Sequence, residues 1–130
     1  MEVILIADVQ KTYALVLGAV LVLLGLVGFV NHPVLGLFGV NVLQNIVHLA
    51  GGAAIIWFGY KAGAAKSTNM WLGIAGVLLA VLWFIPGTGG DLGLLSQLFG
   101  INAAISYLHL GVGIVSLAVA YGVKEGAVTA

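Results

Sequence analysis

The sequence contains no cysteine and no arginine, and only 6% of its 130 residues are charged. Without cysteine the chain has no disulfide, no thiolate nucleophile and no cysteine-ligated zinc or iron–sulfur site. Without arginine, and with a formal net charge of zero, it has no basic surface to hold phosphates, which excludes nucleic-acid binding. Hydrophobic residues make up 62% of the chain, whereas soluble domains carry about 25% charged residues. This composition is typical of an integral membrane protein.

Three long intervals of the chain carry no charge, namely residues 12–60, 67–90 and 92–123. A helix crosses the ~30 Å hydrocarbon core in about 20 residues, so the first interval holds two spans and each of the others holds one. The run Asn31-His32-Pro33 divides the first interval, because proline disfavours a helix interior. A glycine-rich break at 86–91 follows the third span. We predict an all-α membrane protein with four transmembrane helices, at about 12–30, 41–60, 69–85 and 102–122.

The lysines indicate how these spans are oriented. All four fall on one side of the predicted helices, at Lys11, Lys61, Lys66 and Lys124. Because cytoplasmic loops carry an excess of lysine and arginine, we expect a multi-pass protein of the cell membrane with both termini in the cytoplasm. Aromatic residues gather at the same helix ends, as an interfacial belt requires: Tyr13, Trp57, Tyr60, Trp71 and Tyr121.

The second half of the chain repeats the first. With an offset of 61 residues, positions 37–60 and 98–121 share 8 identities in 24. We predict one membrane domain over 1–130, built by tandem duplication of a helical hairpin, with repeat 1 at about 12–60 and repeat 2 at about 69–122. Hairpins that enter from the same side of the membrane are related by a pseudo-two-fold axis along the membrane normal.

A polar stripe runs along the second predicted helix, and a counterpart runs along the fourth. The spacing i, i+4, i+7, i+11 places each set on one helix face: Asn41, Asn45, His48 and Gly52, and then Asn102, Ser106, His109 and Gly113. Polar groups in hydrocarbon are costly unless they are paired, so both stripes must face protein or a wet cavity. Asn41 and Asn102 stand at the starts of their spans, where we expect them to be helix N-caps.

The intramembrane histidines leave two interpretations open. In the first, His48 and His109 hydrogen-bond with Asn45 and Ser106 between helices, since a neutral imidazole has one donor and one acceptor. Each such bond contributes about 1 kcal/mol or less. In the second, His48 and His109 are the axial ligands of a haem b held inside a four-helix bundle, and the protein is a redox carrier.

Other chemistry has little support in the sequence. His48 and His109 supply two metal ligands with no carboxylate at their depth, and a proton path needs a longer chain of ionisable groups. No nucleophile with an acid or base can be assembled, so we expect no enzyme and no metal. We predict a structural or interaction role, with no cofactor unless haem b binds. Membrane lipid, other membrane protein subunits or a second copy of the chain are the expected partners.

Two segments that contain the histidines resemble the signature segments of a known family. Residues 37–52 and 107–113 are similar to those of the domain of unknown function 4383 family, and the resemblance spans about 12–122. Both histidines match the family pattern, whereas Ser106 stands in the place of the second asparagine. The resemblance implies a small four-helix membrane protein of bacteria or archaea, and it implies no activity.

The predicted orientation has a direct test. Because the chain has no cysteine, Ala64→Cys and Gly90→Cys each introduce a single thiol, one in a lysine-side loop and one in an opposite loop. An impermeant thiol reagent applied to intact cells should label position 90 and leave position 64 unlabelled. Labelling at position 64 alone would overturn the orientation.

Overall fold

The computed structural model describes residues 7–61, 63–125 and 128–129. The described residues form five helices: α1 (Val9–Val30), α2 (Val42–Tyr60), α3 (Ala65–Trp83), α4 (Leu94–Phe99) and α5 (Ala103–Gly122). Two short strands, β1 (Ala7–Asp8) and β2 (Val128–Thr129), pair antiparallel. The predicted all-α class is confirmed.

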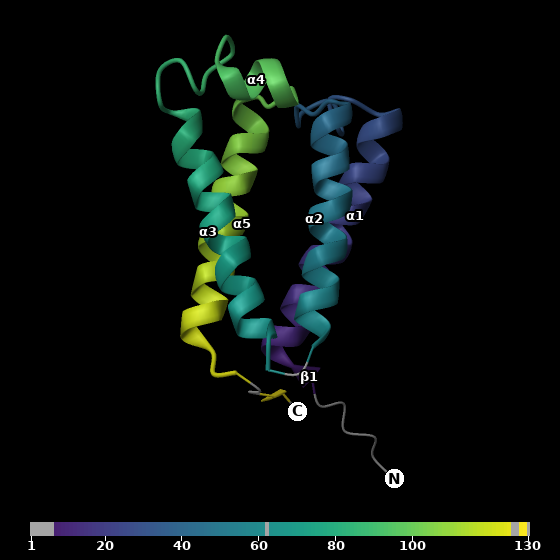
Figure 1. Cartoon of the computed structure of the whole chain (residues 1–130), viewed down its shortest axis with the longest axis vertical. Helices are drawn as coiled ribbons and strands as arrows, with labels where there is room; N and C mark the ends of the chain where they lie inside the picture. Colours follow the sequence, from purple (N-terminus) through teal and green to yellow (C-terminus); the bar gives the residue numbers. More distant parts are fainter. Residues whose placement is uncertain (1–6, 62, 126–127, 130) are drawn as a thin grey trace.

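Four helices, α1, α2, α3 and α5, are long and apolar enough to cross a membrane. They have 19 to 22 residues each, which at 1.5 Å per residue gives about 28–33 Å, the thickness of the hydrocarbon core. They form two antiparallel hairpins, α1 with α2 and α3 with α5, that stand side by side (Figure 1). Large apolar side chains such as Val16, Leu23 and Ile114 are more than half exposed on the outside, where lipid would cover them. The prediction of four spans is confirmed.

Two spans begin earlier than the sequence predicts. α1 begins at Val9 rather than near 12. Asp8 is its N-cap, and the Asp8 carboxylate accepts a hydrogen bond from Lys11 N at 3.0 Å. α3 begins at Ala65 rather than near 69, so Lys66 also lies in a first helical turn. A lysine in the end turn of a helix can extend its ammonium to the interface. The positions of Lys11 and Lys66 therefore indicate where the membrane surface lies, but not where α1 and α3 begin.

The prediction of four helices omits α4, which lies in the connection between α3 and α5. Gly93 is its N-cap, and Gly100, with φ +68°, is a left-handed C-cap whose N–H donates to Ser96 O. Six residues are too few to cross a membrane. The buried Leu95 holds α4 against the helices below it.

The main cluster of buried apolar side chains lies at the α4 end of the molecule. Its members come from the α1–α2 connection, the end of α3, α4 and the start of α5: Val34, Val40, Trp83, Leu95, Ile101 and Ile105. Because these segments belong to both hairpins, the cluster packs one hairpin against the other outside the middle of the membrane.

Glycines bring the two helices of each hairpin into backbone contact. A Cβ on Gly18 of α1 would lie 2.9 Å from Gly52 O, and one on Gly52 of α2 would lie 2.7 Å from Gly18 O. In the other hairpin, a Cβ on Gly113 of α5 would lie 3.0 Å from Gly73 O of α3. Close approach of this kind maximises dispersion contacts, which drive helix association in lipid. Each hairpin is therefore a closely packed unit.

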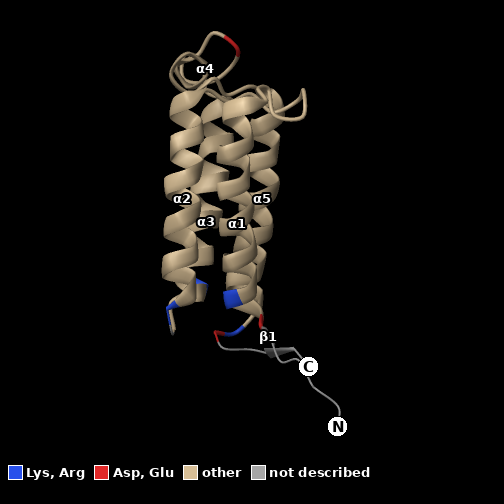
Figure 2. Cartoon of the chain, turned by 90° about the vertical axis from the view of Figure 1, so that its right-hand side faces the viewer, with Lys and Arg blue, Asp and Glu red and all other residues tan. Residues whose placement is uncertain are grey.

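The lysines lie at one end of the molecule and α4 lies at the other (Figure 2). Four aromatic side chains are 62–67% exposed at the lysine end, as a belt requires: Trp57, Tyr60, Trp71 and Tyr121. Tyr13, predicted to belong with them, instead has its hydroxyl 2.7 Å from Ser116 Oγ of α5. It joins α1 to α5 rather than facing the interface.

The adjacent glycines of α2 provide a matched test of this packing. Gly52→Ala should lower the free energy of unfolding by about 1–3 kcal/mol, because its Cβ meets the α1 backbone and the hairpin must open. A Cβ on Gly51 meets nothing within 4 Å, so Gly51→Ala should be neutral or stabilise by up to ~1 kcal/mol. Titration with dodecyl sulfate in mixed micelles, followed by circular dichroism, measures both. Equal losses in the two variants would contradict close packing at Gly52.

Candidate functional site

Two asparagines exchange hydrogen bonds between the hairpins at the α4 end. Asn41 Nδ2 donates to Leu98 O at 2.8 Å, and Asn102 Nδ2 donates to Leu37 O at 2.9 Å. Asn102 Oδ1 also accepts from Gly39 N at 2.9 Å. We call Asn41 and Asn102 the asparagine clasp. It ties the connection of each hairpin to the other hairpin.

The same two side chains begin the helices that follow them. Asn41 Oδ1 accepts a hydrogen bond from Gln44 N at 3.0 Å, and Asn102 Oδ1 accepts one from Ile105 N at 3.1 Å. Both asparagines have extended backbone, as N-caps do. Each side chain therefore uses its oxygen to start a helix and its amide hydrogens to reach the other hairpin.

A second polar junction lies at the lysine end, between Gln10 of α1, Asn69 of α3 and the end of α5. Gln10 Nε2 lies 2.8 Å from Val119 O and 2.7 Å from Val123 O, to which it donates. Asn69 Nδ2 donates to Gln10 Oε1 at 2.9 Å, and both side chains are fully buried. This Gln10–Asn69 pair joins three helices from both hairpins.

His48 of α2 and His109 of α5 meet between the hairpins. Their ring centroids are 6.2 Å apart with the planes at 69°, an edge-to-face arrangement. Gln44 Nε2 lies 3.0 Å from His48 Nε2. An amide nitrogen only donates, so His48 Nε2 accepts, and Nδ1 carries the hydrogen of the neutral ring. The Nδ1 atoms of both histidines are buried without a hydrogen-bond partner among the described residues.

Asn45 and Ser106, expected to bond to the histidines, have other neighbours in the described structure. Ser106 Oγ donates to Asn102 O at 2.9 Å, one turn back along α5. The Asn45 side chain lies against α1, where a Cβ on Gly28 would overlap its Oδ1. Glycine at this position of α1 leaves the space that Asn45 fills. The structure thus brings the two histidines together, but it directs Asn45 into its own hairpin and Ser106 to its own helix.

The histidine pair is poorly prepared to bind a metal. In the described part of the chain, no three or more His, Cys, Asp or Glu side chains are grouped so that they could hold a metal ion. Iron binds an imidazole through the lone pair of a ring nitrogen. On His48, Gln44 already donates to the Nε2 lone pair, and Nδ1 carries hydrogen. His48 can act as an axial ligand only after the Gln44 side chain moves.

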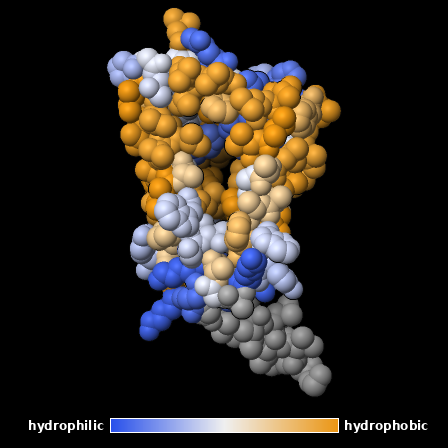
Figure 3. Space-filling view, viewed as in Figure 1, coloured by the Kyte–Doolittle hydropathy of each residue, from blue (hydrophilic) through white to orange (hydrophobic). Residues whose placement is uncertain are grey.

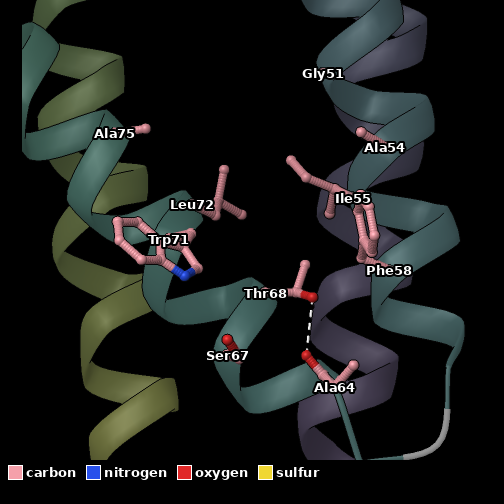
Figure 4. Close-up of a pocket in the computed structure, with 10 residues that line it drawn as sticks. All are labelled: Gly51, Ala54, Ile55, Phe58, Ala64, Ser67, Thr68, Trp71, Leu72 and Ala75. Atoms are coloured by element: carbon pink, nitrogen blue, oxygen red, sulfur yellow. Dashed lines mark hydrogen bonds between the residues drawn. The ribbon is translucent and has the colours of Figure 1, made fainter.

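A groove of about 480 Å³ opens between α2 and α3 in the lysine half of the molecule. Figure 4 shows Ile55 and Phe58 of α2 facing Trp71 and Leu72 of α3 across it. The Thr68 hydroxyl, also at the groove, donates to Ala64 O at 2.8 Å, so its hydrogen is paired within α3. The space-filling view shows this face hollowed between two hydrophobic halves (Figure 3). We call this feature the α2–α3 groove.

Comparison with known protein families identifies the family of the chain. The model of the family described as Domain of unknown function (DUF4383) matches residues 11–122. The chain belongs to this family. The resemblance carried by the segments around His48 and His109 is thereby confirmed. No curated protein and no solved structure matches the chain, so the role of this DUF4383 member rests on its own residues.

Sequence reasoning missed three polar side chains of this DUF4383 protein. Gln10 fell before the predicted first span, Asn69 marked the start of the third, and Gln44 was passed over between Asn41 and Asn45. Each is an amide within the first turns of an apolar helix. An amide in that place is costly unless it has a partner, and that cost is the signal that could have identified all three.

The asparagine clasp can be tested by separating its two roles. Asn102→Ala should lower the free energy of unfolding by about 2–3 kcal/mol, because it removes an N-cap and two bonds to the other hairpin. Asn102→Asp keeps the oxygens that cap α5 but cannot donate to Leu37 O, so its loss should be intermediate. Dodecyl sulfate titration of the three proteins measures the difference.

Asn31→Ala is the matched control for the clasp. Asn31 Oδ1 accepts from Leu35 N at 2.7 Å, a bond within one connection, so its removal should cost about 1 kcal/mol or less. A loss for Asn31→Ala as large as that for Asn102→Ala would show that the bonds between hairpins contribute nothing beyond a local cap.

Proposed function

We propose that this chain is a small structural or interaction protein of the membrane, without catalytic activity, that serves as a subunit of a larger membrane assembly or as a homo-oligomer. The observation that carries the proposal is where its polar side chains bond. Asn41, Asn102 and Gln10 each donate to backbone carbonyls of the other hairpin. These three side chains thus hold the two hairpins together and do not converge on a cavity of substrate size.

The outer surface also fits this role. α1 exposes a row of apolar side chains, with Val20, Leu23 and Leu26 each at least half exposed. Membrane lipid or another transmembrane helix is the partner that such a face accepts. The longest connection between spans, residues 84–102, packs as α4 against the helix ends and forms no separate domain. A protein partner would therefore dock sideways within the membrane.

We infer that the two hairpins arose by tandem duplication and are related by a pseudo-two-fold axis along the membrane normal. The asparagine clasp supports this, because its two hydrogen bonds are equivalent under the 61-residue offset. The donor Asn41 corresponds to the donor Asn102, and the acceptor Leu37 corresponds to the acceptor Leu98. The glycine contacts support it as well, since they occupy corresponding places in the two hairpins: Gly18 with Gly52, and Gly73 with Gly113.

We further propose that the protein lies in the cell membrane with both termini in the cytoplasm. The grouping of the lysines at one end of the helices supports this orientation (Figure 2). At the opposite end the described charge is Asp91, in the connection before α4. Acidic residues contribute little to orientation, so the lysines decide it.

One observation favours a second function, a haem b redox carrier. His48 and His109 face each other from α2 and α5 with ring centroids 6.2 Å apart, and the buried Nδ1 of His109 has no partner among the described residues. Two histidines from different helices of a bundle are a common axial pair. Against this function stand the hydrogen bond from Gln44 to His48 and the burial of His48, which is 4% exposed.

An absorption spectrum of the protein purified from its native host separates the two functions. We expect a colourless preparation, with His48→Leu costing about 1–2 kcal/mol of stability because Gln44 loses its acceptor. A Soret band that disappears in both His48→Leu and His109→Leu would establish the haem function instead.

The interaction role has its own test. Crosslinking in native membranes, followed by purification in mild detergent and mass measurement, should recover the chain in a complex with another membrane protein or with itself. A chain found strictly alone and monomeric at its native abundance would contradict the proposal.

A further inference from the structure

The α2–α3 groove carries an inference that goes beyond the structural role. Its walls are apolar, with Ile55 and Phe58 on α2 facing Trp71 and Leu72 on α3 (Figure 4). Small residues such as Gly51 line it and leave its volume open. Within a bilayer such a space cannot hold water at low cost, because its lining offers few hydrogen-bonding groups. Something apolar must fill it.

The dimensions of the groove select a flexible chain over a helix. Its lining on α3 runs from Ala64 to Ala75, a rise of about 16 Å, close to half the ~30 Å hydrocarbon core. A volume of about 480 Å³ spread over that length gives a mean cross-section of about 30 Å². A helix with its side chains is ~10 Å across and has a cross-section of about 80 Å². The groove thus has the length of one leaflet and the width of a single hydrocarbon chain.

The lysine end of the groove is positively charged. The Lys61 ammonium lies 5.3 Å from the centroid of Phe58, a wall of the groove. Lys66 is nearby, but its backbone N–H donates to Glu125 Oε2 at 2.8 Å, which brings a carboxylate beside it. Lys61 is therefore the cation best placed to meet a headgroup.

We propose that the α2–α3 groove is a binding site for one anionic phospholipid, with an acyl chain between α2 and α3 and the phosphate near Lys61. The apolar walls take the chain, and the charge at the mouth selects the headgroup. Anionic lipids are enriched in the cytoplasmic leaflet, the leaflet in which the lysine end lies under the proposed orientation.

Native mass spectrometry of the detergent-purified protein tests this site. The protein is mixed with equal amounts of phosphatidylglycerol and phosphatidylcholine that have the same acyl chains. The wild-type protein should retain one phosphatidylglycerol in preference to phosphatidylcholine by about fivefold, the factor expected from one basic residue near the surface. Lys61→Gln should keep binding lipid but lose this preference.

Two matched glycines provide the variants. A Cβ on Gly51, which lines the groove, and one on Gly111, on α5, both meet nothing within 4 Å. Gly51→Leu places its side chain in the groove and should reduce lipid retention about tenfold or more, because it displaces two or more methylenes. Gly111→Leu should retain lipid as the wild-type protein does. Ala54→Phe fills the groove from a second position if Gly51→Leu does not purify.

Three results would overturn the proposal. Equal retention of the two lipids by the wild-type protein would remove the headgroup site. Unchanged retention in both groove-filling variants would place the lipid elsewhere. A dimer that Gly51→Leu dissociates, with no lipid bound to the wild-type protein, would make a second copy of the chain the occupant.

Discussion

The amide groups of Asn41 and Asn102 form the interaction on which the relative placement of the two hairpins depends. Each donates to a backbone carbonyl in the connection of the other hairpin, at Leu98 and Leu37. In lipid no hydrophobic force draws one helix pair to another, so dispersion contacts and hydrogen bonds must do so. The glycine contacts provide the dispersion term within each hairpin. Between the hairpins the polar bonds lie at the ends, with the asparagine clasp at one and the Gln10–Asn69 pair at the other.

This division explains two features that lie between the asparagine clasp and the lysine end. Because the hairpins are joined at their ends, α2 and α3 can stand apart between those ends, which opens the α2–α3 groove. The same separation leaves room for His48 and His109 to meet edge to face. The histidines thus occupy a junction that the clasp positions, and the groove is a consequence of where the bonds are made. The proposed structural and lipid-binding roles both rest on this one arrangement.

Much of the fold could be predicted from the sequence because the membrane simplifies it. Charge and Pro33 divide the chain into four apolar intervals, and the offset of 61 residues pairs Asn41 with Asn102 and His48 with His109. α4 was missed because six residues, bounded by glycines, resemble a loop in any window long enough to detect a span. The partners of Asn45 could not be predicted, because its packing depends on Gly28 of a different helix. Helix spacing gives the face on which a side chain lies, but not the neighbour that it meets.

Distances between spin labels test the central claim that polar bonds at the ends hold two rigid hairpins together. Labels on cysteines at Val47 and Leu78, both about half exposed, report the distance between α2 and α3. Labels at Leu23 and Val47 report the distance between α1 and α2, within one hairpin. The account predicts narrow distributions for both pairs in the wild-type protein. With Asn41→Ala and Asn102→Ala combined, the Val47–Leu78 distribution should broaden to longer distances while the Leu23–Val47 distribution stays unchanged. If both distributions remained narrow and unshifted, the asparagine clasp would not be what holds the hairpins together.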